Sequence, residues 1–440
     1  MEYYNIINSI YTSLITNHIV TPCFKIELLD ENERAYREIT QQVSIDSSGS
    51  ISATYQQGVR KTISLTFFDA NGEFIPDPYN QNLWIGKKFK VYLGLTTSKL
   101  STQENPLVHK NSTSDLLLYY QMQQGVDNLN SSGVLLNSNN DVVSTDYTFW
   151  FSKGVFILTS ITANRTSEQK TVSISGVDKF GRFTADTGYN EMIANYVIKA
   201  NTPLYEALTT ILLQDCGNGQ PIDPIIPIID PCYHDVRIPY EIQKGAGSYM
   251  GDIITELATM FRADVYYDDD GRFNFRRALL GDDSILAPTI WQIDTNSGEY
   301  LSSSIDYDLI NAINTVYVVG DNPSSPIAPE AYAQNNNPAS PLNVATNGIR
   351  SRLYTSSTIK TRTEAQDYAF YMLNQFSRIQ QSLSLTLTFI PHLMVGSLIE
   401  LTDDFYGFVR EHFVIQSITF PLGLGEMTIG CSNIQELPTY

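Results

Sequence analysis

Two pairs of strand-like stretches, far apart in the chain, carry nearly the same order of apolar and polar residues. Residues 156–162 read FILTSIT, and residues 413–419 read FVIQSIT. Each is followed by a second alternating stretch, VSISG at 172–176 and MTIG at 427–430. Alternation with a period of two is typical of strands with one buried face. The repeated pair predicts a duplicated β unit, which restricts the folds open to the chain.

Two further matches precede these in the same order. Residues 62–68 (TISLTFF) resemble residues 384–390 (SLTLTFI), and residues 86–91 (GKKFKV) resemble residues 396–401 (GSLIEL). Four matches in one order favour duplication of a whole unit. The alternative is that amphipathic strands look alike because they share a composition.

The composition favours a folded, β-rich protein without a dedicated nucleic-acid surface. The chain has 440 residues, enough for more than one domain, and its 27 Tyr and 20 Phe favour strands. The net charge of −19 argues against a phosphate-binding surface, which needs Lys and Arg. An acidic surface would instead repel DNA and let it pass without sticking, or it would serve solubility alone.

The ends and the cysteines give little sign of export or of a membrane. Four cysteines at irregular spacing predict no disulfide framework and fit assembly in a reducing cytoplasm. Residues 1–21 lack the pattern of a signal peptide, and we interpret them as an N-terminal arm or helix. No apolar run approaches the roughly 18 residues of a membrane span, so no membrane insertion is expected.

The order of signals along the chain predicts three domains after this arm. Residues 22–188 hold the first copy of the β unit, interrupted by a Ser/Asn/Gln-rich surface insertion at 99–148. Residues 189–290 change to a small α+β domain. Residues 291–440 return to strands, with a Pro/Asn/Ala-rich loop at 321–348 and a helix at 363–380, and they end in the second copy.

Three helices are predicted from apolar periodicity and capping residues. Thr202 is expected to cap a helix whose first residue is Pro203, and Ser248 is expected to cap a second one. The third is expected to open with a capping box formed by residues 363–366 (TEAQ). A strand pair at 263–267 and 272–276 around residues 268–271 (DDDG) reads as a hairpin.

Two clusters raise the question of a metal. In an EF-hand frame with Gly271 at the sixth position, Tyr266 would stand first and Arg277 twelfth, so both key ligands are missing and a hairpin turn is favoured. Cys216, Cys232 and His234 offer three zinc ligands, but their spacing departs from finger patterns and a fourth is absent. We expect no metal and no cofactor.

No arrangement of residues specifies catalysis. Residues 86–88 (GKK) lack the remainder of a phosphate-binding loop, and no nucleophile elbow is present. His392 and His412 read as loop residues. The carboxylate pairs at 282–283 and 403–404 stand in turn-like contexts, where solvated charge is common. No catalytic residue is expected, the binding residues stay unknown, and we expect no enzyme.

The order of these features resembles the central baseplate hub (tail hub) proteins of tailed bacteriophages and related contractile injection systems. The resemblance covers most of the chain from about residue 22, apart from 99–148 and 321–348. The stretches that carry it are GVRK at 58–61 before a Leu-Thr-Phe strand, Trp84 before Lys87 and Lys88, KGVF at 153–156, SGVDK at 175–179, PYEI at 239–242, AG at 246–247 and the YYD hairpin at 266–268.

The resemblance implies a β-rich α+β fold with two tail-tube-like β-barrel domains in one chain, 22–188 and 291–440, and a small α/β domain between them. It implies a homotrimer that joins a sixfold tail tube to a threefold spike and lines the DNA channel. Implied partners are the tail tube or distal tail protein, the central spike or tail-tip protein, DNA in non-specific transit and, as a further candidate, the tape measure protein.

The implied location is the virion tail baseplate or tip, after assembly in the host cytoplasm. Two alternatives remain open at this point. One is a tail-tip enzyme that degrades host cell wall or glycan, and the other is a β-rich host adhesin. Some relatives carry a cell-wall hydrolase domain, and no such extension is visible in this sequence.

Overall fold

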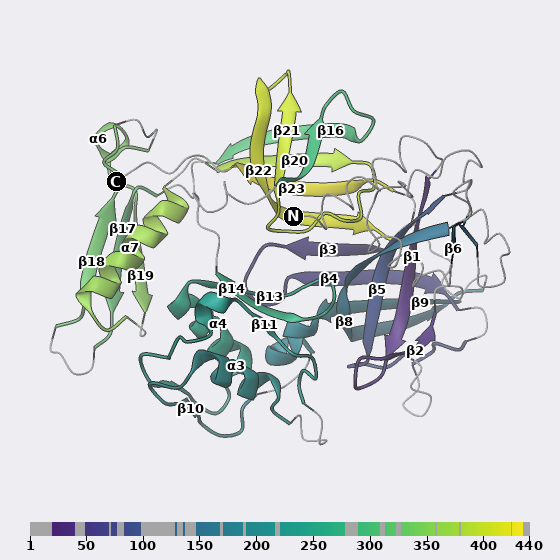
Figure 1. The fold of residues 1–440 in the computed structure, drawn as a ribbon, viewed down its shortest axis with the longest axis horizontal. Coiled ribbons are helices and arrows are strands. Elements are labelled where there is room, and N and C mark those ends of the chain that lie inside the picture. The colour runs from purple at the N-terminus through teal and green to yellow at the C-terminus, as the bar shows by residue number, and fades with distance from the viewer. Residues whose placement is uncertain are drawn as a thin grey trace.

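The structure is a computed structural model, in which strands are the main regular elements (Figure 1). It describes residues 20–39, 49–69, 72–76, 83–97, 128–129, 135–136, 147–167, 170–187, 191–215, 221–277, 289–308, 313–322, 327–338, 340, 342–356, 359–377, 380–423 and 425–433. The insertion at 99–148 and the arm at 1–21 lie mostly outside these residues. Within them, β6 (Asn128–Leu129) pairs with β7 (Leu135–Leu136), and Val20 and Thr21 already belong to β1.

Alternating sequence produces the strands of both predicted copies. The first unit consists of β1 (Val20–Leu29), β2 (Ala35–Glu38), β3 (Ser50–Thr54), β4 (Lys61–Phe68), β5 (Lys88–Thr97), β8 (Tyr147–Arg165) and β9 (Lys170–Asp178). The second unit consists of β15 (Thr289–Asp294), β16 (Tyr300–Asp308), β20 (Gln380–Leu387), β21 (Leu398–Asp403), β22 (Phe408–Pro421) and β23 (Met427–Asn433).

The order of strand pairing repeats between the units. In the first unit the order is β3-β4-β9-β8-β5, and in the second it is β16-β20-β23-β22-β21, with every pair antiparallel. Each of the four sequence matches therefore falls on strands in equivalent places. The duplication predicted from the sequence is confirmed in the pairing of the strands.

Irregularities of the backbone repeat as well. The ladder between β8 and β9 shifts after Leu158, and the ladder between β22 and β23 shifts after Ile415, the residue that the sequence match sets against Leu158. Gly86 (φ 84°) and Gly396 (φ 79°) turn the chain before β5 and β21. The Gly86 N–H donates to the Leu158 carbonyl at 2.7 Å, and the Gly396 N–H donates to the Ile415 carbonyl at 2.8 Å. A bulge and a left-handed glycine in the same places are specific features of a shared backbone design.

The match between β4 and β20 is displaced by two residues. The sequence pairs Leu65 with Leu387, but the ladders to β9 and β23 make Leu385 its counterpart, since Leu65 faces Ile174 and Leu385 faces Ile429. A slip of two keeps every side chain on the same face of the sheet, so the alternation alone does not reveal it.

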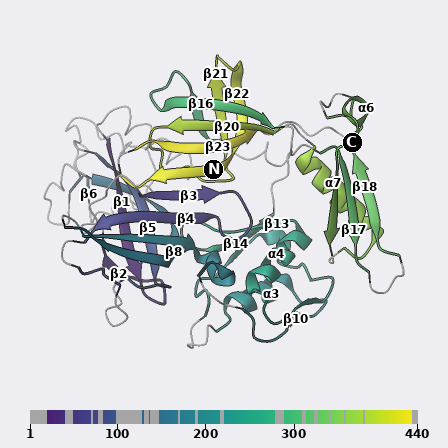
Figure 2. The same ribbon diagram turned by 180° about the vertical axis from the view of Figure 1, so that it is seen from behind.

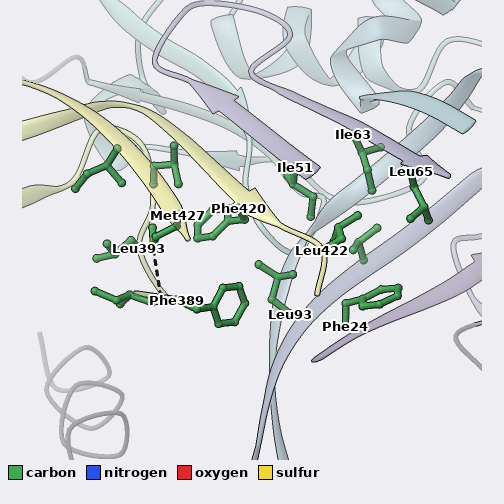
Figure 3. Packing of buried hydrophobic residues seen from close by; sticks show 14 of the residues in the cluster. Phe24, Ile51, Ile63, Leu65, Leu93, Phe389, Leu393, Phe420, Leu422 and Met427 are labelled. Atoms are coloured by element: carbon green, nitrogen blue, oxygen red, sulfur yellow. Dashed lines mark hydrogen bonds between the residues drawn. The ribbon is translucent and has the colours of Figure 1, made fainter. Parts of the chain in front are cut away.

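The two units share one sheet and one core. Strand β3 lies between β4 and β22, so the described strands join into a 13-stranded sheet through a junction between the units (Figures 1 and 2). In Figure 3, Ile51, Ile63 and Leu65 of the first unit face Phe420 and Met427 of the second. The fold is β-rich α+β, as expected. The pairing of the described strands closes neither unit into a ring, so two separate barrels are not confirmed.

The small α+β region packs below the first unit and has its own core (Figure 1). Helix α3 (Leu204–Leu212) buries Leu204, Leu208 and Ile211, and α4 (Met250–Phe261) packs beside it. The other elements are η2 (Lys179–Phe183), η3 (Ala185–Thr187), β10 (Tyr196–Ile198), β11 (Ile228–Ile229), η4 (Pro231–Tyr233), β12 (Ile242–Lys244), β13 (Ala263–Tyr267) and β14 (Phe273–Arg277).

Two predicted caps of this region are wrong by one residue. Helix α3 is capped by Pro203, and the Thr202 hydroxyl donates instead to the Lys199 carbonyl at 2.8 Å. Helix α4 is capped by Tyr249 rather than Ser248. The carboxylate of Asp252 accepts the Tyr249 N–H at 2.9 Å, and this bond sets the first turn one residue later.

A third, small core stands apart at the left of Figure 1. Helix α7 (Arg362–Phe376) covers one face of a sheet made of β17 (Thr315–Gly320), β18 (Glu330–Gln334) and β19 (Ser351–Ser356). We call these elements the inserted module. The segment predicted as a loop, 321–348, contains β18 and the short α6 (Val344–Asn347). This prediction is wrong because β18 buries only Ala331 and Ala333, which give a weak apolar signal.

The helix of the inserted module is shorter than predicted and begins earlier. Its capping box uses Thr361 and Glu364, not Thr363 and Gln366: the Thr361 hydroxyl accepts the Glu364 N–H, and the Glu364 carboxylate accepts the Thr361 N–H. Both four-residue frames fit the motif, and the sequence alone does not choose between them. The domain limits themselves, 22–188, 189–290 and 291–440, stay predictions.

Candidate functional site

The first unit, the second unit and the small domain meet at Lys153. Strand β8 bulges beside β5, where Val91 pairs with Gly154 but Tyr92 pairs with Ser152, so Lys153 is the extra residue. Its side chain is 4% exposed. The ammonium lies 3.3 Å from the Asp269 carboxylate of the small domain.

The second unit supplies the remaining contacts of this ammonium. It donates to the Leu393 carbonyl at 3.2 Å, and it lies 4.6 Å from the centre of the Phe420 ring. One side chain therefore contacts two other parts of the fold. Burial lowers the pKa of Lys153, while the carboxylate of Asp269 opposes that shift.

Asp269 comes from the turn at 268–271, which the sequence predicted. Its carboxylate pairs with Lys61 as well as with Lys153. Burial acts to raise the pKa of Asp269, but the two lysines outweigh it and hold the pKa below its usual value. Asp268 accepts the N–H groups of Asp270 and Arg272, as a turn residue does. The carboxylates that suggested calcium are thus engaged by lysines and by the backbone.

A second group of buried charges surrounds Lys179, which follows β9. Its ammonium lies 2.7 Å from Asp223 and 2.8 Å from Glu33, and it donates to the Gly271 carbonyl at 2.9 Å. Lys179 and Asp223 are at most 2% exposed. Glu33 also pairs with Lys88 at 2.7 Å. These bonds tie the β1–β2 turn and β5 of the first unit to the small domain.

A third contact of the same kind joins Arg60 to Asp264, beside the rings of Tyr55 and Tyr266. Next to it, Asp178 accepts the backbone N–H groups of Arg60 and Lys61 at 2.8 and 2.9 Å. Burial raises the pKa of Asp178 to about 6, and the backbone donors only partly offset the shift.

Three groups of buried ion pairs of this sort are expensive unless every charge has a partner. Here each charge has a partner, and most of the pairs join the first unit to the small domain. Such matching fixes their relative position more specifically than apolar packing does, because a small slip would leave a charge unpaired. The contacts are suited to holding the first unit and the small domain in one fixed arrangement.

His392 lies next to this junction and differs from its predicted character. It stands in a turn, as expected, but it is only 5% exposed. Its ring lies 5.1 Å from the Trp291 ring and 6.3 Å from the Phe151 ring, centre to centre. Burial, with Lys153 as a second cause, lowers the pKa of His392 to about 3, so the ring is neutral at neutral pH.

The other residues considered in the sequence do not come together. Cys216 and the pair 282–283 lie outside the described residues. Cys232 is exposed, and the His234 ring contacts the Ile229 carbonyl at 3.1 Å. Asp403 caps a tight turn by accepting the Phe405 N–H at 2.8 Å, and His412 lies 3.3 Å from Glu400. Across the part of the chain that the structure describes, no three such side chains are placed to hold a metal.

A hollow of about 510 Å³ opens on the small domain, lined by Tyr196, Thr209, Thr210, Leu213 and Gln214. These side chains bring no carboxylate, imidazole or thiol into it. No described helix is long and apolar enough to cross a membrane.

Sequence reasoning missed the buried charges of the junction. The available signal was weak: Lys153 stands in an otherwise apolar run, and Asp178 and Lys179 close a strand whose alternating positions are apolar. A charge at an inward position of a strand predicts a buried partner, but the partners lie about 40 to 200 residues away in sequence.

The fold matches those of phage tail proteins along nearly the whole chain. The tail protein from Neisseria meningitidis MC58 matches with a TM-score of 0.55 and 11% identity, over 94% of this chain and 97% of the other. The 43 kDa tail protein of prophage MuSo2 from Shewanella oneidensis matches with a TM-score of 0.54 and 11% identity, over 94% and 99%.

A third match is the prophage tail protein gp18 from Listeria monocytogenes EGD-e, with a TM-score of 0.50 and 12% identity over 93% and 94% of the two chains. No family model matches the chain, and a search of the curated proteins finds no match. The resemblance to phage tail proteins that the sequence suggested is therefore confirmed at the level of the fold, which this chain shares with phage and prophage tail proteins.

Proposed function

We propose that the chain is a structural hub protein of a phage tail or a related injection particle, working as a homotrimer. The observation that carries the proposal is the repeated strand order of the two units. Three copies of a chain with two equivalent units offer six equivalent positions around one axis. Such a ring can meet a sixfold tube on one side and a threefold spike on the other.

The shared fold supports a tail role, because the match extends over whole chains of tail proteins. In this proposal each unit completes a tube-like barrel in the assembled ring. The net charge of −19 per chain suits a channel through which DNA passes without adhering. The partners would be the tail tube or distal tail protein, and the spike or tail-tip protein.

The buried charges at the junction support a structural role rather than an enzymatic one. Lys153, Asp269 and Lys61 are paired with each other. We therefore assign no reaction to the chain, and we place it in the tail baseplate or tip after assembly in the host cytoplasm.

The mass of the purified chain in solution tests the proposal directly. Light scattering or native mass spectrometry should give three times the 49.4 kDa of one chain. Immunolabelling of purified particles should place the chain at the tail end. A monomer at all concentrations that is also absent from purified particles would overturn the proposal.

A further inference from the structure

The junction between the two units shows how neighbouring units pair. Strand β3 of the first unit runs antiparallel to the last part of β22, with Ile51 opposite Phe420 and Ala53 opposite Ile418. The hydroxyls of Ser52 and Thr419 lie 3.4 Å apart. Ile51 and Ile418 are both 1% exposed. This contact is a sheet ladder with a buried apolar face.

Each of the two strands in this ladder has a counterpart in the other unit. In the first unit β3 pairs with β4, setting Ile51 opposite Ile63. In the second unit β16 pairs with β20, setting Ile305 opposite Leu383. The register to β23 makes Leu383 the counterpart of Ile63, so Ile305 is the counterpart of Ile51.

The other partner, the last part of β22, corresponds to the last part of β8. Residues 160–164 match residues 417–421, so that Ile161 is the counterpart of Ile418 and Ala163 that of Phe420. In β22 this part follows directly on the segment that pairs with β21. In β8 it follows directly on the segment that pairs with β5.

One copied edge is β16, the strand at one end of the sheet, and the other is the last part of β8, which extends beyond the segment that pairs with β5. Among the described strands, β16 pairs only with β20, and residues 160–165 of β8 pair only with β9. Ile161 and Ile305 pack against the main core but are only partly buried, whereas their counterparts are 1% exposed. An open strand edge with incompletely covered apolar residues is a template for another strand.

We propose that β16 of one copy of this chain pairs with residues 160–164 of β8 in the next copy, in the register of the internal junction. This register sets Ala163 opposite Ile305 and Thr162 opposite Asp306, with the strands antiparallel. The occupant is a second copy because the edge that fits β16 is already present on the same chain. The inference rests on the proposed trimer and specifies its interface.

The same contact, repeated, closes a ring. The surfaces that meet are different, β8 on one copy and β16 on the next, so the interface is heterologous. Internal and interchain junctions then alternate around the axis with equivalent geometry. Three copies close into a ring when each interchain junction rotates one unit relative to the next by the same angle as the internal junction does.

A pair of cysteines tests the register in the full chain. Ala163→Cys with Ile305→Cys places two thiols directly across the proposed ladder, and mild oxidation should give covalent dimers and trimers on a non-reducing gel. The matched control is Ala163→Cys with Ser304→Cys, in which the second thiol faces the other side of the sheet. We expect at least tenfold more cross-linked chain in the first variant than in the control or in either single variant.

Hydrogen exchange on the unchanged chain gives a readout that needs no substitution. In the trimer, amides of residues 160–164 and 304–306 should exchange as slowly as those of residues 50–54. A trimer whose two edges exchange fast, or that cross-links no better than the control, would overturn the pairing while leaving the hub proposal intact. A chain that is never trimeric would instead remove the hub proposal itself.

Discussion

Lys153 in the first unit and Arg410 in the second lie at equivalent irregularities of the ladder. In both, the longer strand has one residue too many, opposite the step from Val91 to Tyr92 in β5 and opposite the step from Leu401 to Asp403 in β21. Lys153 is buried and contacts both other parts of the fold. The Arg410 side chain is 66% exposed and binds the buried Glu400 carboxylate at 2.8 Å. The same backbone feature thus serves two different environments.

The difference shows which properties of the duplicated unit are shared. Strand order, bulges and the glycines at 86 and 396 are common to both, because they are set by alternation and by local backbone geometry. The charges are not shared. Lys88 is buried against Glu33 of the β1–β2 turn, whereas its counterpart in the second unit is Leu398. The charged residues of each unit therefore depend on what packs against it, whereas the backbone geometry is common to both copies.

Replacing Lys153 and Arg410 should give the largest difference in stability between the two units. Lys153→Met should lower the free energy of unfolding by about 3 kcal/mol, because it removes one partner of a buried ion pair. Arg410→Met, the matched control, should lower it by less than about 1 kcal/mol, because the Arg410 side chain is mostly exposed and Glu400 keeps its contacts with Thr289 and His412. Urea denaturation followed by fluorescence measures both. Equal losses in the two variants would contradict the distinction between the bulges.

His392 offers a pH-dependent test of the same border. Its pKa of about 3 in the folded chain lies below the unfolded value near 6.5. Below pH 6.5 the unfolded chain therefore binds a proton at His392 that the folded chain does not bind. Its contribution to stability is therefore complete above pH 6.5 and is lost at lower pH, by about 2 kcal/mol between pH 7 and pH 5.

His392→Gln should remove this loss, so the stability difference between variant and unchanged chain should shift by that amount over the range. Asp178 works in the opposite sense: its raised pKa of about 6 makes stability increase as the pH falls from 6 toward 4. Comparing variant with unchanged chain at each pH cancels this contribution. A stability difference that stays constant from pH 7 to pH 5 would show that His392 does not titrate as proposed.

The two turn glycines give the smallest of the three effects. Gly86→Ala should cost about 1 kcal/mol, the cost of a left-handed backbone for alanine, because open space surrounds the added Cβ. Gly396→Ala should cost about 2 kcal/mol, since its Cβ would lie 2.8 Å from the Tyr55 ring. Thermal unfolding ranks the two. If Gly86→Ala lowered the stability more than Gly396→Ala, the two turns would not be equivalent.

The repeat could be predicted because strands carry their own signal. Alternating apolar positions around Leu158 and Ile415 mark the inward face without any knowledge of the neighbours. The two-residue slip in β20 was not predictable, since a period of two looks identical after the slip. Alternating motifs thus reveal which strands repeat more reliably than they reveal the register.

The junction was out of reach for a different reason. Asp223, Lys179 and Glu33 meet from three distant segments, and nothing local distinguishes them from solvated charges. Strand β18 was missed because its inward residues are alanines. What the sequence could not supply was therefore the identity of the partner across long separations, which only the assembled fold defines.

The pairing of β3 with β22 also delays completion of the central sheet during synthesis. The Ser52 and Thr419 hydroxyls that meet in this ladder are 367 positions apart. While the chain leaves the ribosome, β3 has no partner strand on that side until residues 417–421 have been made. A product terminated before β22 would thus leave this edge of β3 unpaired, and it would lack one of the two strands that form the junction between the units. Incomplete copies would for this reason be excluded from the particle by their own geometry.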